Sequence, residues 1–337
     1  MIIKKYHAYG VGAALVDTEI EVEDHELVGF GIEKGLMTLV DEERQETLME
    51  HLQDHLTVAR MTSGGSAANS IIALSCFGGN AYYSCKVADD ENGRFYLADL
   101  AAADVQHPGD HGLPTGTTGK CLVLITPDAE RTMNTYLGIS ESVGVENLDL
   151  QAITDSHFLY VEGYLVTSTT GRQAAIVARQ HAEQNGTKTA ISLSDPGMVA
   201  HFRDGLDEMI GDGVDLLFCN RDEAMGWTGE NDMDAVIECM KSTAHSFAIT
   251  LGAKGALIYD GEVLHTIAPT QVTAVDTNGA GDMFAGAFLY GITQGMSYDK
   301  AGRLASIAAA AVVAQFGPRL HIGQHQNILD SISGTLS

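Results

Sequence analysis

The sequence is poor in positive charge. Its 337 residues include 19 Lys and Arg but 45 Asp and Glu, which leaves a net charge of −26 at pH 7 with histidine neutral. Such a charge repels nucleic acids and anionic membrane surfaces except at a local basic spot. We therefore expect neither a nucleic acid nor a membrane among the partners of this protein.

Cysteine pairs and long apolar runs are missing as well. The five cysteines are odd in number, scattered and without a C-x-x-C pattern, which indicates reduced thiols in the core and no structural zinc site. No apolar run approaches the ~20 residues that cross a bilayer. The first apolar stretch is broken by His7, Asp17 and Glu19 before a secretory signal could form. These absences predict a cytoplasmic protein.

Two common nucleotide-binding motifs are absent too. No Gly-Lys pair is followed by Ser or Thr, and no G-x-G-x-x-G occurs. A P-loop NTPase and a dinucleotide-binding fold are therefore both poorly supported.

The chain does have the hydrophobic content, 45%, for a large buried core. Short β-branched or aromatic runs alternate along it with helical patterns. The predicted strands lie at residues 6–10, 121–125, 158–161, 189–193, 216–219, 247–250 and 256–259, and the predicted helices at 66–77, 172–185, 282–293 and 301–316. This alternation predicts an α/β fold with a mainly parallel sheet covered by helices.

Two segments, at about 17–40 and 114–137, do not fit the alternation. The first is acidic and strand-like, and the second has the pattern strand, Pro-Asp turn, strand. A hairpin inserted between sheet elements is a natural lid. We therefore predict a single domain over residues 1–337 with a small β lid.

The segment from Asp276 to Phe288 is the most informative part of the chain. Gly279, Ala280 and Gly281 have almost no side chain, so their backbone N–H groups can converge on an anion at the start of the following helix. Asp282 follows in the first turn, where a carboxylate either caps the helix or accepts a proton from a hydroxyl beside a phosphate. The functional alternative predicts phosphoryl transfer.

Three further motifs allow a functional and a purely structural interpretation. The segment 63–69 opens a helix on two glycines, which permits either close ligand approach or only a tight turn. The segment 220–223 follows a strand and offers a carboxylate for Mg²⁺ through water, or only an Asx turn. The segment 250–255 is a hairpin or a floor for a nucleotide.

The pairs His51/His55 and His321/His325 lack a third ligand, so we expect surface histidines.

In combination and in this order, these motifs resemble the PfkB carbohydrate kinase family. The resemblance rests on the glycine pair near residue 64, on N-x-x-E at 220–223, on T-L-G-A-K-G from residue 250 and above all on D-T-N-G-A-G-D-x-F from residue 276. The segments 10–17, 64–66 and 163–165 look most like the adenosine kinase branch. The resemblance implies a ribokinase-like three-layer α/β sandwich with a mainly parallel central sheet, a small β lid, and a monomer or homodimer.

The resemblance also implies roles for single residues and cofactors. The cofactors would be ATP and Mg²⁺, and a monovalent cation such as K⁺ near Asp276 stays open. Asp282 would be the base, and Gly279, Ala280 and Gly281 the anion hole. The acceptor would meet Asp17, Gly64, Gly65 and Asn69, with Leu15, Tyr164 and Leu165 placed to sandwich a base. ATP would meet Asn220, Thr250, Gly252, Gly255 and Arg131, and Glu223 would hold Mg²⁺ through water.

The chain departs from adenosine kinases at two positions. They commonly have Asn where this chain has Ala13, and an aromatic residue where it has Gly197. We therefore expect a kinase for the primary hydroxyl of a ribosyl compound, with a nucleoside such as adenosine favoured. A ribokinase-, fructokinase- or ketodeoxygluconate kinase-like enzyme for a free sugar or sugar acid is the alternative. A non-catalytic nucleotide-binding regulator is a second alternative.

Overall fold

The computed structural model describes residues 4–53, 55, 60–109, 112–321 and 323–334. Its larger sheet comprises β1 (Tyr6–Val11), β5 (Ala81–Ser84), β6 (Val105–Gln106), β9 (Ser156–Glu162), β10 (Lys188–Ser192), β11 (Val214–Asn220), β12 (Ala244–Thr250), β13 (Ala256–Tyr259) and β14 (Leu264–Ile267). The strand order is β14-β13-β12-β11-β10-β9-β1-β5-β6, and only β13 and β14 pair antiparallel to their neighbours. The predicted mainly parallel sheet is therefore confirmed.

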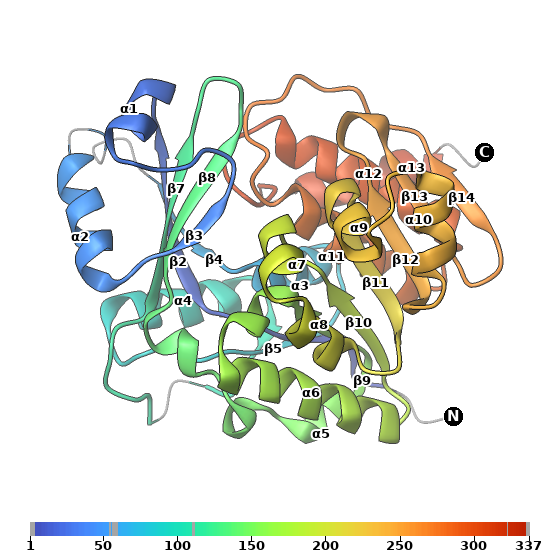
Figure 1. Ribbon diagram of the computed structural model, residues 1–337. Coiled ribbons are helices and arrows are strands. Elements are labelled where there is room, and N and C mark those ends of the chain that lie inside the picture. Colours follow the sequence, from blue (N-terminus) through green and yellow to red (C-terminus); the bar gives the residue numbers. More distant parts are fainter. Residues whose placement is uncertain (1–3, 54, 56–59, 110–111, 322, 335–337) are drawn as a thin grey trace.

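Helices cover both faces of this sheet (Figure 1). One buried apolar cluster joins its first face to α3 (Ser66–Cys76), α4 (Glu91–Ala102), α11 (Ala280–Thr293), α12 (Tyr298–Val313) and α13 (Gln324–Gly334). A second cluster joins the other face to α5 (Leu150–Thr154), α6 (Thr169–Gln184), α7 (Pro196–His201), α8 (Arg203–Ile210), α9 (Arg221–Thr228) and α10 (Met233–Met240). The strands are apolar almost throughout because both of their faces are buried.

A smaller sheet is formed by the two segments that break the alternation and by one strand that the sequence did not indicate. It comprises β2 (Leu15–Glu21), β3 (Met37–Leu39), β4 (Arg60–Gly64), β7 (Gly119–Ile125) and β8 (Arg131–Tyr136), in the order β3-β8-β7-β2-β4. Two helices, α1 (Asp24–Gly29) and α2 (Glu42–His51), lie on its outer side (Figure 1). We call these five strands the lid sheet.

The two faces of the lid sheet differ because strand side chains alternate. Ile20, Leu122 and Leu124 point outward and pack with Leu27 of α1 and Leu48 of α2. The alternate positions on the inner face line a cavity between the two sheets: Leu15, Asp17, Met37, Leu39, Cys121, Arg131, Met133 and Thr135. The lid sheet therefore has one apolar face and one face available to a ligand.

Short single-turn elements complete the chain: the 3₁₀ helices Gly138–Ser142, Val145–Asn147, Gly163–Thr167 and Gly252–Lys254. Two details differ from the sequence-based expectations. Cys76 and Cys239 are exposed instead of lying in the core, although all five cysteines are free thiols. His325 is not a surface residue, because it is only 5% exposed and its ring meets Phe77 edge-on. No helix in the described ranges is long and apolar enough to cross a membrane.

Candidate active site

A cavity of about 510 Å³ is lined by residues at the carboxyl ends of the central parallel strands and on the inner face of the lid sheet. Open α/β sheets bind their ligands at this edge, because each strand there turns into a loop that can present side chains. Strands β9 to β12 and the start of α11 contribute to the cavity, as do β2, β3, β7 and β8 of the lid sheet. Residues from 13 to 284 therefore meet in one site.

The turn before α11 leaves its first N–H groups open toward the cavity. Gly279 has φ +73, and a Cβ there would lie 2.3 Å from the carbonyl oxygen of Pro318, so only glycine fits. Asp276 holds the turn, because its two carboxylate oxygens accept hydrogen bonds from the N–H groups of Asn278 (2.8 Å) and Gly317 (2.9 Å). No side chain caps this helix in the described structure. An anion therefore fits at this terminus.

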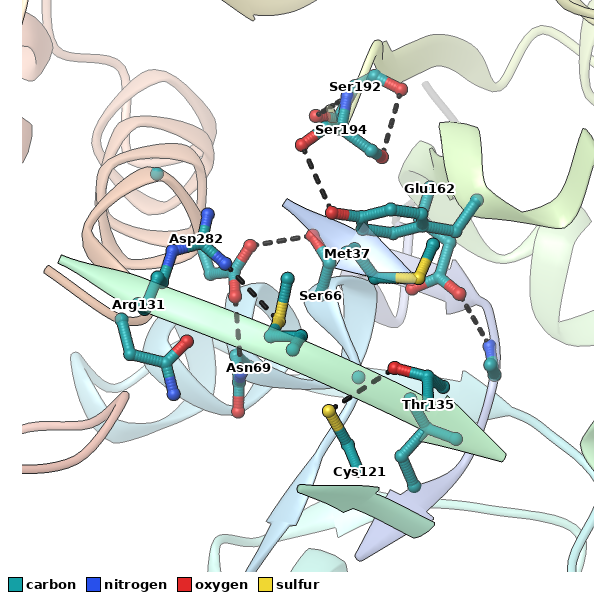
Figure 2. Close-up of a pocket in the computed structure, with 18 of the residues that line it drawn as sticks. Met37, Ser66, Asn69, Cys121, Arg131, Thr135, Glu162, Ser192, Ser194 and Asp282 are labelled. Atoms are coloured by element: carbon teal, nitrogen blue, oxygen red, sulfur yellow. Dashed lines mark hydrogen bonds between the residues drawn. The ribbon is translucent and has the colours of Figure 1, made fainter. Parts of the chain in front are cut away.

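Asp282 lies in the first turn of the same helix and is oriented by two donors (Figure 2). Its Oδ1 accepts from the hydroxyl of Ser66 at 2.6 Å, and its Oδ2 accepts from Nδ2 of Asn69 at 3.1 Å. Burial raises the pKa of Asp282, and those two hydrogen bonds lower it, as do the positive charges of Arg131 and Arg319. The result is a fixed carboxylate whose pKa lies above that of an ordinary aspartate.

Asp17 approaches the cavity from the lid sheet. The side chain is 6% exposed, and a Cβ on Gly64 would lie 2.0 Å from its Oδ1, so the glycine is required by the close approach of the carboxylate. Burial and the neighbouring Glu19 raise the pKa of Asp17 to about 8, against the lowering effect of Arg319. In the described structure no residue donates a hydrogen bond to Asp17, which leaves its oxygens available for hydroxyl groups of a ligand.

Arg131 is the basic side chain that lines this cavity. It comes from β8 of the lid sheet, and its guanidinium donates a hydrogen bond to the sulfur of Met133, at 3.4 Å. Within the described ranges it forms no ion pair, although the carboxylates of Asp282, Asp195 and Glu130 are close enough to interact with its charge. A guanidinium in this position offers a fork of donors to a phosphate.

Asn220 and Glu223 line the cavity where β11 runs into α9. They form a capping box: Glu223 accepts from the backbone N–H and the Nδ2 of Asn220 at 3.0 and 2.5 Å, and Asn220 Oδ1 accepts from the N–H of Glu223. Burial raises the pKa of Glu223 to about 7. Because both of its oxygens already accept hydrogen bonds, this carboxylate suits a metal held through water molecules.

Sequence reasoning missed two charged residues at this site. Glu162 ends β9 and is 1% exposed, and its carboxylate accepts from the N–H groups of Ala13 at 2.6 Å and Ala67 at 2.8 Å. Burial raises the pKa of Glu162 to about 7. Arg319, in the loop between α12 and α13, contacts Asn69. The sequence signal for Glu162 is its place directly after the apolar run 158–161, which surface residues share. Arg319 follows Gly317 and Pro318 and has no such signal.

Nearly all the residues predicted for the site line the cavity. They are Leu15, Asp17, Gly65, Asn69, Arg131, Tyr164, Leu165, Asn220, Glu223, Thr250, Gly252, Gly279, Ala280, Gly281 and Asp282. Gly64 lies behind Asp17 and is not a lining residue. Gly255 is not one either: it has φ +89, and a Cβ there would lie 2.0 Å from the carbonyl oxygen of Ile267. The structure therefore gives Gly255 a part in the β12–β13 hairpin.

The described residues contain no group of three or more His, Cys, Asp or Glu side chains that could hold a metal directly. His55 interacts instead with Glu26, at 3.1 Å. A metal in this cavity would therefore depend on water and on a bound anion for its remaining ligands.

Comparisons with known proteins agree with this geometry. The model of the pfkB family carbohydrate kinases matches residues 37–323. The crystal structure of adenosine kinase from Sinorhizobium meliloti superposes with a TM-score of 0.92 at 32% identity, over 97% of this chain and 99% of that one. A probable sugar kinase from Rhizobium etli CFN 42 gives 0.91 at 32% identity, with the same coverage. Adenosine kinase 1 of Arabidopsis thaliana is 25% identical over 332 residues, 91% of this chain and 94% of that protein. The predicted ribokinase-like fold is confirmed.

Proposed function

Because the chain belongs to the pfkB family of carbohydrate kinases, we propose that it phosphorylates the primary hydroxyl of a ribosyl compound, with a nucleoside such as adenosine as the preferred acceptor. Membership of this family makes the protein a phosphotransferase that uses ATP and an alcohol acceptor. The identity of the acceptor, the role of each residue and a cytoplasmic location go beyond what family membership gives.

The observation that carries the proposal is the position of Asp282. Its carboxylate is fixed by Ser66 and Asn69 and lies one residue after the open turn Gly279–Gly281. A hydroxyl placed between Asp282 and that turn can lose its proton to the carboxylate while the turn binds negative charge. This arrangement serves phosphoryl transfer, which depends on positioning and on charge stabilisation.

The residues present fit ATP and Mg²⁺. The uncapped N–H groups at the start of α11 and the unpaired guanidinium of Arg131, as the described residues show it, suit phosphate oxygens. Thr250 and Gly252 line the same end of the cavity as Asn220 and can accommodate the rest of the nucleotide. Glu223 and Asn220 would hold Mg²⁺ through water, and the ion would neutralise phosphate charge.

The charge of the cavity favours a neutral acceptor. Its described lining includes six carboxylates, from Asp17, Glu130, Glu141, Glu162, Glu223 and Asp282, but only one basic side chain, Arg131. A sugar acid or a sugar phosphate would bring a further negative charge to this surface without a cation of its own. This is the physical reason for placing a nucleoside or a free sugar ahead of a sugar acid.

The apolar part of the cavity favours a nucleoside over a bare sugar. Leu15, Met37, Tyr164 and Leu165 line it near the lid sheet, and they would leave apolar surface uncovered beside a small polyol. Asp17 has two oxygens available for a cis-diol, which a ribosyl group provides. We therefore assign the ribose to Asp17 and the base to the apolar side chains.

We further propose that the lid sheet closes over the bound acceptor. Its inner face supplies Leu15, Asp17 and Arg131, whereas Asn220, Glu223 and Asp282 come from the central sheet and the helices that follow its strands. A monovalent cation near Asp276 stays a prediction, because both oxygens of this buried carboxylate already accept backbone hydrogen bonds.

A coupled assay of ADP release with a panel of acceptors tests the proposal. We expect adenosine or a close ribonucleoside to give the highest kcat/KM, with ribose and fructose lower and sugar acids lowest. A free sugar or sugar acid that outperforms every nucleoside would refute the acceptor assignment. Nucleotide binding without phosphorylation of any acceptor would instead support a regulatory protein.

A further inference from the structure

The C-terminal loop after α12 reaches the centre of the site through one arginine. Arg319 donates from Nε to Oδ1 of Asn69 at 3.0 Å and from a terminal nitrogen to the carboxylate of Asp99 on α4 at 2.6 Å. Its other terminal nitrogen donates to the hydroxyl of Ser63 on β4 at 2.7 Å. The same hydroxyl also contacts Asp99. Each of the three guanidinium nitrogens thus donates to a different element: α3, α4 or β4.

The contact with Asn69 fixes the orientation of an amide that could otherwise flip. A guanidinium has only donors, and a carboxylate has only acceptors. Asn69 therefore satisfies both neighbours in one orientation alone, with Oδ1 toward Arg319 and Nδ2 toward Oδ2 of Asp282. The flipped amide would place its N–H₂ group against Arg319 and its oxygen against the carboxylate.

We propose that Arg319 is a positioning residue that holds Asn69 with its amide group toward Asp282 and so keeps the carboxylate of Asp282 oriented for proton transfer. Arg319 itself does not touch the reacting groups. The inference rests on the role of Asp282 in the proposed function and adds a residue outside the motifs of the sequence. A purely structural tie among α3, α4 and β4 is the alternative that the experiment must exclude.

Two further contacts show that the loop supports the same region. Gly317 donates its N–H to Asp276, and the backbone of Pro318 lies so close to Gly279 that a Cβ there would clash with it. Gly317, Pro318 and Arg319 therefore contact both the turn before α11 and Asn69 on α3, and so fix the position of one relative to the other. Loss of the Arg319 side chain alone leaves the other two contacts in place.

Arg319 also contributes positive charge near Asp282, and several other groups face the same carboxylate. They are Arg131 from β8, Asp17 from β2, Tyr160 and Glu162 from β9, and Tyr164 from the following turn. Arg131 and Arg319 lower the pKa of Asp282, whereas the carboxylates oppose its ionisation. Removing Arg319 shifts this balance toward the protonated, inactive form of the base.

The test compares the pH dependence of kcat in Arg319→Gln with that of the wild type. We expect kcat to fall about tenfold or more and the acid limb of the profile to move up by about half a unit to one unit, with KM for ATP unchanged. Arg94→Gln removes an exposed arginine from α4, paired with Asp89 at the surface, and should change neither quantity. A glutamine variant with lowered thermal stability but a wild-type kcat and acid limb would establish the purely structural role.

A second variant covers a folding failure of the first. Arg319→Lys keeps the positive charge, so the acid limb should stay within about 0.3 unit, but one ammonium cannot hold Asn69, Asp99 and Ser63 in a planar fork. We expect kcat to fall several-fold, and a wild-type kcat would overturn the proposal. Asp282→Asn distinguishes failure of the proposed function from failure of this inference. If Asp282→Asn keeps its activity, the proposed function fails. If Asp282→Asn is inactive but Arg319→Gln is fully active, only the role of Arg319 is refuted.

Discussion

The central sheet and the lid sheet differ in what their faces touch. Both faces of the central sheet are covered by helices and by extended buried apolar clusters. In the described structure the outer face of the lid sheet packs against α1 and α2. Its inner face packs Val123 and Ile125 near Phe316 and turns Asp17, Cys121 and Arg131 toward the cavity. The stability of a sheet with one face on a cavity depends on what fills the cavity. We therefore expect the central sheet to be a fixed frame and the lid sheet to respond to ligands.

The largest expected effect on activity comes from replacing Asp282, the carboxylate at the start of α11. Asp282→Asn should leave ATP affinity nearly unchanged and lower kcat by about 10²–10⁴-fold, because the amide keeps the shape of the side chain but cannot accept the proton. Steady-state kinetics and ATP titration measure both quantities. Asp234→Asn, at an exposed position in the first turn of α10, is the matched control and should have no effect. A variant with more than about a third of the wild-type kcat would remove Asp282 from this role.

The contribution of the lid sheet is tested by the ribose hydroxyls. Without the 2′-hydroxyl, one oxygen of the buried Asp17 carboxylate has no hydrogen-bond partner, which weakens transition-state binding by ~1–3 kcal/mol. The 2′-deoxy analogue of the best nucleoside should therefore have a kcat/KM about ten- to a hundredfold lower. Asp17→Ala should abolish this discrimination together with most of the activity. The comparison of the two sheets loses its basis if wild-type enzyme accepts both nucleosides equally, or if the alanine variant still discriminates between them.

The raised pKa of Asp17 leads to a prediction of how the stability of the free enzyme varies with pH. Burial raises the pKa of Asp17 in the folded protein to about 8, whereas the unfolded value is ~3.9. The folded state therefore binds this proton more tightly, so the stabilising contribution is complete below the unfolded pKa and is lost as the pH rises toward 8. Asp17→Asn cannot titrate, and its unfolding free energy relative to wild type should rise by at least about 1 kcal/mol between pH 5 and pH 8.

Denaturant unfolding of wild type and Asp17→Asn at the two pH values measures this change. The variant Asp128→Asn provides a control on the lid sheet, since Lys34 holds the pKa of that exposed carboxylate down, to about 2. Its difference from wild type should stay constant from pH 5 to pH 8, where Asp128 is ionised in both states. A constant difference for Asp17→Asn as well would contradict a raised pKa at this position.

The smallest expected effect is a change in local protection. Binding of the acceptor should slow hydrogen exchange and proteolysis in β7, β8 and their connecting turn more than in β9 to β12, because the inner face of the lid sheet gains contacts that the central sheet already has. Mass spectrometry of exchanged peptides, with and without acceptor, gives the comparison. Equal protection of the two sheets would count against a lid that closes.

The central sheet could be predicted from the sequence more fully than the lid sheet. Apolar runs such as 216–219 and 247–250 predict buried strands because they are too short for a helix and alternate along the chain with helical patterns. The strand Arg60–Gly64 was missed, since its Ser63 and Gly64 are typical of a turn and its pairing with β2 depends on residues far away in the sequence. Local patterns do not encode such pairing.

The site shows the same limit. The turn Gly279–Gly281 and Asp282 were recognisable because one short segment contains both the anion-binding N–H groups and the carboxylate. Glu162 and Arg319 were not, because each acts on segments more than ninety residues away in the sequence. A single buried acid or base cannot be distinguished from a surface residue until the fold shows which groups it meets.

The contact of the 317–319 loop with the rest of the site bears on the order in which the protein matures. A chain is synthesised from its N-terminus, and a domain generally folds as a unit. Asp17 on the second strand and Asn69 on α3 leave the ribosome long before Arg319, and the turn at Gly279 emerges without the Pro318 that packs against it. The site therefore cannot be aligned until the 317–319 loop has been synthesised, whatever strands have formed before it.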